Sequence, residues 1–195
     1  VTMPDKPAGR GQHVQESPVK KYALSEDIPV LQPEKLRDED FLVQLKMLQA
    51  DIQIVVAFRM LPEVVWNMPR LGTFNLHASL LPQYRGAAPI NWAIINGEKE
   101  TGVTTFFLKH EIDTGNIILQ RSTPLSDDDN VGTLYDRLMN MGAELVVETM
   151  ERITMDDVST MPQDDSVAVN PAPKIFKEDC KINWNKSAAE LHNFV

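Results

Sequence analysis

The chain has 195 residues, of which 43% are hydrophobic and 24% charged, and it carries a formal net charge of −9. This composition is ordinary for a globular protein, and the length allows one domain with the start of a second. The acidic balance excludes broad, non-specific binding of nucleic acid but leaves room for a local basic patch. The single cysteine, Cys180, excludes an internal disulfide and favours the reducing cytoplasm. No apolar run reaches the roughly 20 residues that cross a bilayer, so no membrane partner is expected.

Residues 1–21 combine a local basic patch with three prolines and two glycines. Because that density of Pro and Gly suppresses helix and strand alike, the segment is predicted to be a loop. A solvated surface loop is the simplest interpretation of its charge alone. Its basic residues are Lys6, Arg10, Lys20 and Lys21.

Helices and strands are predicted to alternate after this loop. Residues 38–50 place Phe41, Leu45 and Leu48 at helical spacing, and 52–58 form an apolar, β-branched run typical of a strand buried on both faces. This alternation predicts an α/β fold with a mostly parallel sheet. Further strands are predicted at 73–78, 102–108 and 116–125, and further helices at 89–97 and 132–153.

The helix at 132–153 is the clearest in the sequence. Its apolar stripe consists of Leu134, Leu138, Met141 and Leu145, and Thr133 with Asp136 resembles a capping box. After about residue 156 the chain turns polar and rich in proline, which indicates a linker.

Asn75 and His77 stand at the end of the predicted strand 73–78, where ligands bind in open α/β sheets. Two residues apart on an extended strand, their side chains point to the same face. Asp113 lies in the loop 109–115, within reach of His77. The amide and a protonated imidazole can stabilise an oxyanion, and the carboxylate can orient the imidazole. With no Ser or Cys in a nucleophile elbow, the set suits direct attack on an acyl-type group by a substrate nucleophile.

Each of these residues also has a simpler interpretation. A lone strand-end histidine is more often structural than catalytic, and Asp113 before Thr-Gly can cap a turn. A metal site built from His77, His110, Glu111 and Asp113 is a further alternative. Its spacing matches no known metal-binding motif, so no metal is expected.

Five sequence blocks follow one another along the chain: Asn-x-His at 75–77, Ser-Leu-Leu-Pro at 79–82, Arg-Gly-Ala-Ala-Pro at 85–89, Glu-Thr-Gly-Val-Thr at 100–104 and Asp-Thr-Gly at 113–115. In this order they resemble the folate-dependent formyltransferases. The segment "MPDKPAGRG…SPVK" also resembles the insertion loop of the family members that act on tRNA. The resemblance implies a Rossmann-like catalytic domain of the formyltransferase type at 1–155, a linker at 156–178 and the start of a C-terminal domain at 179–195.

The resemblance further implies a reaction and its partners. The formyl donor is 10-formyltetrahydrofolate, and the acceptor is the amino group of initiator methionyl-tRNA, which Lys6 and Arg10 contact. In this scheme Asn75 and His77 hold the oxyanion and Asp113 orients His77. A cytoplasmic monomer without a metal is expected. The implied cofactor-binding residues are Phe58, Arg59, Met60, Leu61, Ser79, Leu80, Leu81 and Pro82.

Two alternatives and two departures accompany this prediction. The acceptor could instead be a small amine, such as a ribonucleotide or an amino-sugar nucleotide, which the basic segment 1–21 disfavours. The chain could also be a non-catalytic folate-binding module, which the complete set of Asn75, His77 and Asp113 disfavours. Family members begin with a strand, turn and helix that are absent here and end in a barrel domain that this sequence only starts. We therefore expect an internal part of a longer protein, unable to complete its sheet alone.

Overall fold

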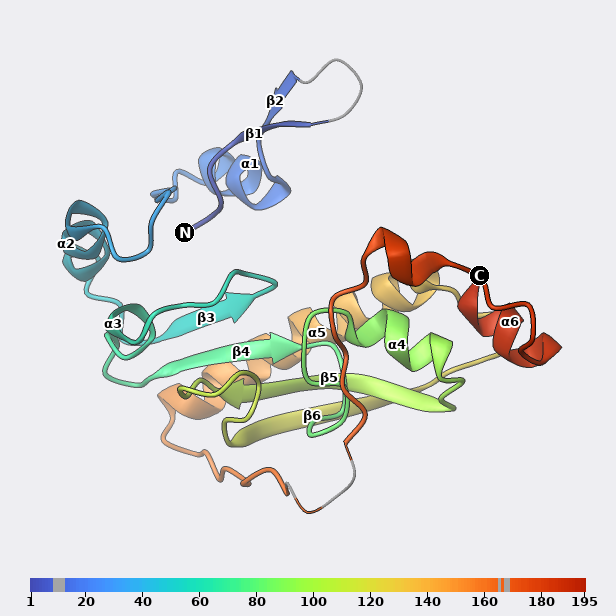
Figure 1. The fold of residues 1–195 in the computed structure, drawn as a ribbon. Helices are drawn as coiled ribbons and strands as arrows, with labels where there is room; N and C mark the ends of the chain where they lie inside the picture. Colours follow the sequence, from blue (N-terminus) through green and yellow to red (C-terminus); the bar gives the residue numbers. More distant parts are fainter. Residues whose placement is uncertain (9–12, 165, 167–168) are drawn as a thin grey trace. The chain divides into compact units, whose positions relative to one another are not determined.

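The computed structural model describes residues 1–8, 13–164, 166 and 169–195. The chain divides into two compact units. Unit 1 comprises Val1–Asp51 and Arg59–Arg70, and unit 2 comprises Ile52–Phe58 and Leu71–Val195. Their helices and strands are labelled in Figure 1.

The described part of unit 1 contains two paired strands and three helices. Strands β1 (Lys6–Ala8) and β2 (His13–Gln15) pair antiparallel, followed by α1 (Pro18–Ser25), α2 (Glu39–Met47) and α3 (Glu63–Trp66). The prediction of a loop is therefore wrong for Lys6–Ala8, His13–Gln15 and the residues from Pro18 on, while residues 9–12 lie outside the described residues. Helix α1 forms despite its proline because Pro18 stands in the first turn, where no N–H is needed. The Ser17 hydroxyl accepts a hydrogen bond from the Lys20 N–H and caps the helix.

The basic patch of unit 1 is partly neutralised by its own neighbours. The Lys20 ammonium forms a close ion pair with Asp5 and a second one with Glu16 at 3.0 Å. Its hydrogen bond to Asp5 holds the pKa of that carboxyl below the ordinary value. Lys6 is exposed on β1, whereas Arg10 lies outside the described residues. Among the basic residues that the structure describes here, the exposed Lys6 and Lys21 are better candidates than Lys20 for meeting a phosphate.

Unit 2 is built on a four-stranded sheet in the order β3 (Gln53–Val56), β4 (Thr73–His77), β5 (Glu100–Phe107) and β6 (Ile117–Pro124). Strands β3 and β4 run parallel, whereas β5 is antiparallel to both β4 and β6. The predicted parallel arrangement is thus found between β3 and β4, whereas the other two pairings of the described sheet are antiparallel. The loop between β5 and β6 is too short for the crossover of a dozen or more residues that a parallel pair requires.

Strand β3 is not buried on both faces as predicted. Its side chains alternate, and Ile54 and Val56 are 40% and 52% exposed. Because β3 forms one edge of the described sheet, its apolar residues do not all find partners within unit 2.

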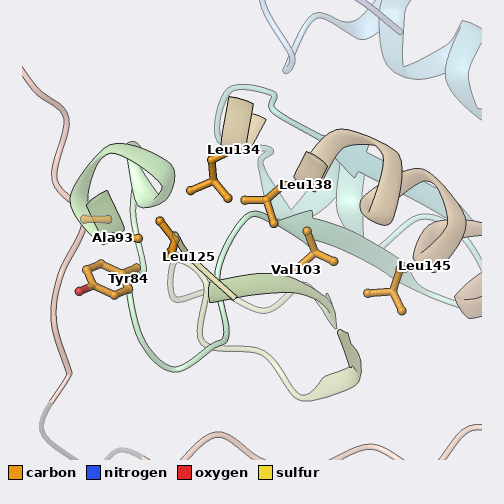
Figure 2. Close-up of a cluster of buried hydrophobic side chains, with 8 residues drawn as sticks. Tyr84, Ala93, Val103, Leu125, Leu134, Leu138 and Leu145 are labelled. Carbon is orange, nitrogen blue, oxygen red and sulfur yellow. The ribbon is translucent and has the colours of Figure 1, made fainter. Parts of the chain in front are cut away.

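Helix α5 (Val131–Thr154) covers one face of β5 and β6 (Figure 1). It begins one residue earlier than predicted, because Asn130 caps it and shares a capping box with Thr133 rather than Asp136. The predicted apolar stripe is confirmed, with Met141 only partly buried. Figure 2 shows its leucines in a core cluster composed of Tyr84, Ala93, Val103, Leu125, Leu134, Leu138, Leu145 and Ala172.

The remaining elements of unit 2 are α4 (Pro89–Ile95), the 3₁₀ helix η1 (Lys177–Cys180) and α6 (Ala188–Phe194). The proline-rich segment after α5 packs against the sheet and its loops. Met161 forms a β-bridge with Ile117, and Ala172 forms one with Gly86. Within the described ranges no helix is long and apolar enough to span a membrane.

The entry into α5 provides a pH-dependent contribution to stability. Asp129 accepts hydrogen bonds from the Ser126 N–H at 2.9 Å and from the Arg137 guanidinium and the Thr133 hydroxyl. These bonds, the Ser126 N–H first, lower the pKa of Asp129 from 3.8 to about 2. A lowered carboxyl pKa stabilises the fold above pH 3.8, and the contribution is lost as the pH falls through about 2.

We therefore expect Asp129→Asn to reduce the free energy of unfolding at pH 6 by about 1 kcal/mol. This value is smaller than the pKa shift alone implies, because water partly screens the interaction of Asp129 with Arg137. The difference between variant and wild type should shrink towards pH 2. Urea unfolding of both proteins at a series of pH values measures it. A difference that stays constant with pH would contradict this assignment.

Candidate active site

Strand β4 separates its side chains into two sets. Leu76 faces α5, since a Cβ added at Gly142 of that helix would lie 2.6 Å from a Leu76 methyl carbon. Asn75 and His77 therefore point to the opposite face of the sheet, as their spacing predicts. His77 stands opposite Thr104 of β5 in the ladder.

His77 is held in a defined orientation and is only 6% exposed. Its Nε2 lies 2.8 Å from the carbonyl oxygen of Tyr84, and its ring meets Phe106 edge-on. Since a carbonyl only accepts hydrogen bonds, Nε2 carries the hydrogen. Nδ1 is then the nitrogen that faces Asp113, 4.0 Å from Oδ2. Nδ1 thus faces the Asp113 carboxylate at a distance that makes an ion pair when Nδ1 carries a proton.

Asp113 is fixed by its own loop and by the loop after β4. Its backbone takes a positive φ of 54°, and its Oδ2 accepts the Gly86 N–H at 3.0 Å. Gly86 cannot readily be replaced, because an added Cβ would lie 2.4 Å from the Ala172 carbonyl oxygen. The carboxylate is thus placed between a backbone donor and His77.

Asn75 is the residue with an unmet hydrogen-bonding requirement. Its Oδ1 is buried and has no hydrogen-bond partner among the residues that the structure describes. An unsatisfied buried polar atom costs about 1–3 kcal/mol, so such atoms call for an explanation. A ligand that supplies a donor at this face of β4 would provide one.

The predicted cofactor-binding segment after β4 lies mostly inside the fold. Ser79 is fully buried and its hydroxyl donates to the Gln83 carbonyl oxygen at 2.6 Å, while Leu81 is buried in the core. Leu80 and Pro82 are partly buried, and the Leu81–Pro82 bond is cis. A ligand could therefore meet this segment through Leu80, Pro82 or the backbone, and the contact stays a prediction.

The other predicted cofactor residues are divided between the two units. Phe58 belongs to unit 2, whereas Arg59, Met60 and Leu61 belong to unit 1. The Arg59 guanidinium donates to the Glu34 carbonyl oxygen at 2.7 Å, and Met60 is exposed. Their contact with a cofactor also stays a prediction.

Sequence reasoning missed two residues of this site. Tyr84 has a positive φ of 60° and is buried, and its hydroxyl is bonded to Glu98 and Asn96. Burial, reinforced by Glu98, raises the pKa of Tyr84 to about 12, so the phenol stays protonated and anchors the carbonyl that holds His77.

Gln163 is the second missed residue. Its side-chain amide donates to the backbone oxygen atoms of Asp113 and Gly115, each at 2.8 Å. It lies in the proline-rich segment predicted as a linker, where no pattern in the sequence marked it. Tyr84, in contrast, stands between two of the blocks that carry the family resemblance, which could have drawn attention to it.

The alternative metal site finds no support in the described part of the chain. No group of three His, Cys, Asp or Glu side chains there is arranged to hold a metal ion. His77 and Asp113 instead have the partners given above.

Known proteins resemble this chain over most or all of its length. Residues 1–150 match the family described as formyl transferase. A methionyl-tRNA formyltransferase of Bacteroides fragilis is 62% identical over 198 residues, covering 100% of this chain and 61% of the relative. One of Parabacteroides distasonis is 63% identical over 200 residues, covering 100% and 62%. The chain thus spans about three fifths of the length of these curated relatives.

Solved structures give the same picture and confirm the α/β fold of the formyltransferase type. HypX from Aquifex aeolicus in complex with tetrahydrofolic acid has a TM-score of 0.66 at 26% identity, covering 80% of this chain and 27% of that one. An N-formyltransferase from Helicobacter canadensis, in complex with folinic acid and dTDP-3-aminofucose, has a TM-score of 0.69 at 25% identity, covering 98% and 66%. With these structures sharing its fold and most of its length matching the family description, the chain belongs to the formyl transferase family.

Proposed function

We propose that this chain carries the catalytic part of an enzyme that transfers a formyl group from 10-formyltetrahydrofolate to the amino group of initiator methionyl-tRNA. The chemistry is supported above all by the buried Asn75 Oδ1, which has no hydrogen-bond partner in the described ranges and lies on the strand face that also carries His77. The acceptor is supported by relatives named methionyl-tRNA formyltransferase at 62–63% identity along the whole chain. The proposal includes action as a monomer in the cytoplasm.

The residues of the site would divide the work. The bound folate supplies an activated formyl group, whose carbonyl oxygen gains negative charge as the amine attacks. The Asn75 amide would donate to that oxygen and could accept an N–H of the amine, which would satisfy its buried oxygen. The amine must lose a proton as the new C–N bond forms and the bond from formyl carbon to folate nitrogen breaks. His77 Nδ1 and Asp113 would hold that proton and return it to the leaving nitrogen.

A small amine remains the alternative acceptor. The Helicobacter canadensis neighbour was solved with an amino-sugar nucleotide, but its identity to this chain is only 25%. The basic residues of unit 1 favour a substrate rich in phosphates. A test of those residues therefore distinguishes the two acceptors.

In the full-length enzyme we expect Arg10→Ala to lower kcat/KM for charged initiator tRNA by about 10-fold at low salt, with a smaller loss for the exposed Lys6→Ala. The loss should shrink at higher ionic strength, because phosphate contacts release counterions. Folate affinity should not change. Formylation rates at two salt concentrations, with a folate titration alongside, measure this.

Lys99→Ala is the matched control, since Lys99 is an exposed lysine of unit 2 that already pairs with Asp127 at 2.8 Å. It should leave kcat/KM unchanged at both salt concentrations. Equal rates for Arg10→Ala and wild type at both concentrations would remove this support for tRNA and favour the small amine.

A further inference from the structure

Gln163 uses the full hydrogen-bonding capacity of its side chain at the predicted site. Its Nε2 donates to the backbone oxygens of Asp113 and Gly115 at 2.8 Å each. Its Oε1 accepts from Nε and Nη2 of Arg85 at 2.9 and 2.6 Å. Two donors and two acceptor positions are all that a primary amide offers.

These partners can be satisfied only by an amide. A guanidinium has no acceptor, so the side-chain oxygen must face Arg85, and carbonyl oxygens have no donor, so the nitrogen must face the 113–115 loop. A carboxylate at position 163 would suit Arg85 but repel the two carbonyls. An ammonium would suit the carbonyls but repel Arg85. The chemistry of the site thus specifies glutamine.

Gln163 bonds to the residue that faces His77: its side chain donates to the Asp113 carbonyl oxygen, and the Asp113 carboxylate faces His77 Nδ1. Asp113 has the positive φ given above, a backbone conformation that costs energy unless its surroundings maintain it. Gln163 holds its carbonyl, and the Gly86 N–H holds its carboxylate. Arg85, the other partner of Gln163, follows Tyr84 and precedes Gly86 in the sequence. The Tyr84 carbonyl oxygen accepts the hydrogen bond from His77 Nε2.

One side chain therefore joins the two loops that contact the two nitrogens of His77. We propose that Gln163 is a positioning residue for formyl transfer, acting through Asp113 and the loop of Arg85 on His77. This rests on the function proposed above. Gln163 contacts no reacting atom in this scheme, and it brings the segment after α5 into the catalytic architecture.

The test uses two substitutions of Gln163 in the full-length enzyme. Gln163→Glu keeps the acceptor for Arg85 and loses the donors to Asp113 and Gly115. Gln163→Leu loses both the acceptor and the donors. Trp92→Phe is the matched control, because it removes a bond that fastens the same segment elsewhere, from the indole Nε1 to the Pro173 carbonyl oxygen at 2.8 Å. The readouts are kcat, KM for the folate donor, and hydrogen exchange of the Gly86 amide by NMR.

Both Gln163 variants should lower kcat by about 10-fold or more, as small displacements of a reacting group do, with KM for the donor nearly unchanged. Exchange of the Gly86 amide should accelerate in both, because its acceptor Asp113 is no longer held. Trp92→Phe should change neither kcat nor this exchange.

Unchanged kcat in Gln163→Glu, or an equal loss in Trp92→Phe, would overturn the positioning role. Failure of the proposed function itself looks different, because the wild-type enzyme would then transfer no formyl group. The Gly86 exchange still decides the role of Gln163 in that case. Exchange at the wild-type rate in both Gln163 variants overturns it.

Discussion

Replacing His77 with alanine is expected to lower kcat for formyl transfer by about 100-fold or more in the full-length enzyme, the usual effect of losing a positioned group that takes up and returns a proton. The ring is buried, its Nε2 is bonded to the Tyr84 carbonyl and its Nδ1 faces Asp113. Such an oriented imidazole acts in the transition state more than in substrate binding. Affinity for the folate donor should therefore change little. Single-turnover rates together with a folate titration measure both quantities.

The matched control for this variant is His192→Ala. His192 lies in α6 with an exposed ring, and its Nε2 is 3.2 Å from the Asp127 carbonyl oxygen. Its removal should leave kcat unchanged. Asp113→Asn should resemble His77→Ala in the direction of its effect, since the neutral amide cannot pair with a protonated ring. If His77→Ala turned over at the wild-type rate, direct participation of the imidazole would be excluded.

Replacing Asn75 with leucine should separate activity from stability. We expect kcat to fall by about 100-fold, because the amide would no longer meet the developing oxyanion. We also expect the free energy of unfolding to stay the same or rise, since the buried Oδ1 has no partner in the described structure and its removal relieves a cost of about 1–3 kcal/mol. Leucine has the same number of side-chain heavy atoms and the same branch point as asparagine, so the variant leaves no cavity. Urea unfolding and formylation assays on the same preparation measure both effects.

Thr104→Val is the contrasting control for stability. Thr104 is also buried, but its hydroxyl donates to the Ser79 carbonyl oxygen and accepts from the Leu81 N–H and the Gln120 amide. Its loss leaves several groups unsatisfied and should destabilise the protein by about 1–3 kcal/mol. A similar loss of stability in Asn75→Leu would mean that the Asn75 amide is structural.

Much of unit 2 could be predicted from local pattern. The apolar stripe of α5 and the strand that carries Asn75 and His77 both follow from periodicity in the sequence. The wrong predictions concern segments whose local sequence pattern is compatible with two different structures. A β-branched run such as 52–58 predicts a strand but not which of its faces is covered, and Pro18 can interrupt a helix or begin one. The alternation of helices and strands favoured a mostly parallel sheet, whereas β5 runs antiparallel to β4 and β6, because pairing is settled by which strands become neighbours.

The sequence by itself determined that Asn75 and His77 share one face, because the spacing of two residues on an extended strand leaves no other arrangement. It also indicated the family, through the order of its motif blocks. Only the tertiary structure decided how these groups are held. Tyr84 directs its carbonyl at His77, and Gln163 reaches Asp113 across 50 residues of chain. Such contacts depend on the path of the backbone through space, and a hydrogen bond between distant residues leaves no periodic trace in the sequence.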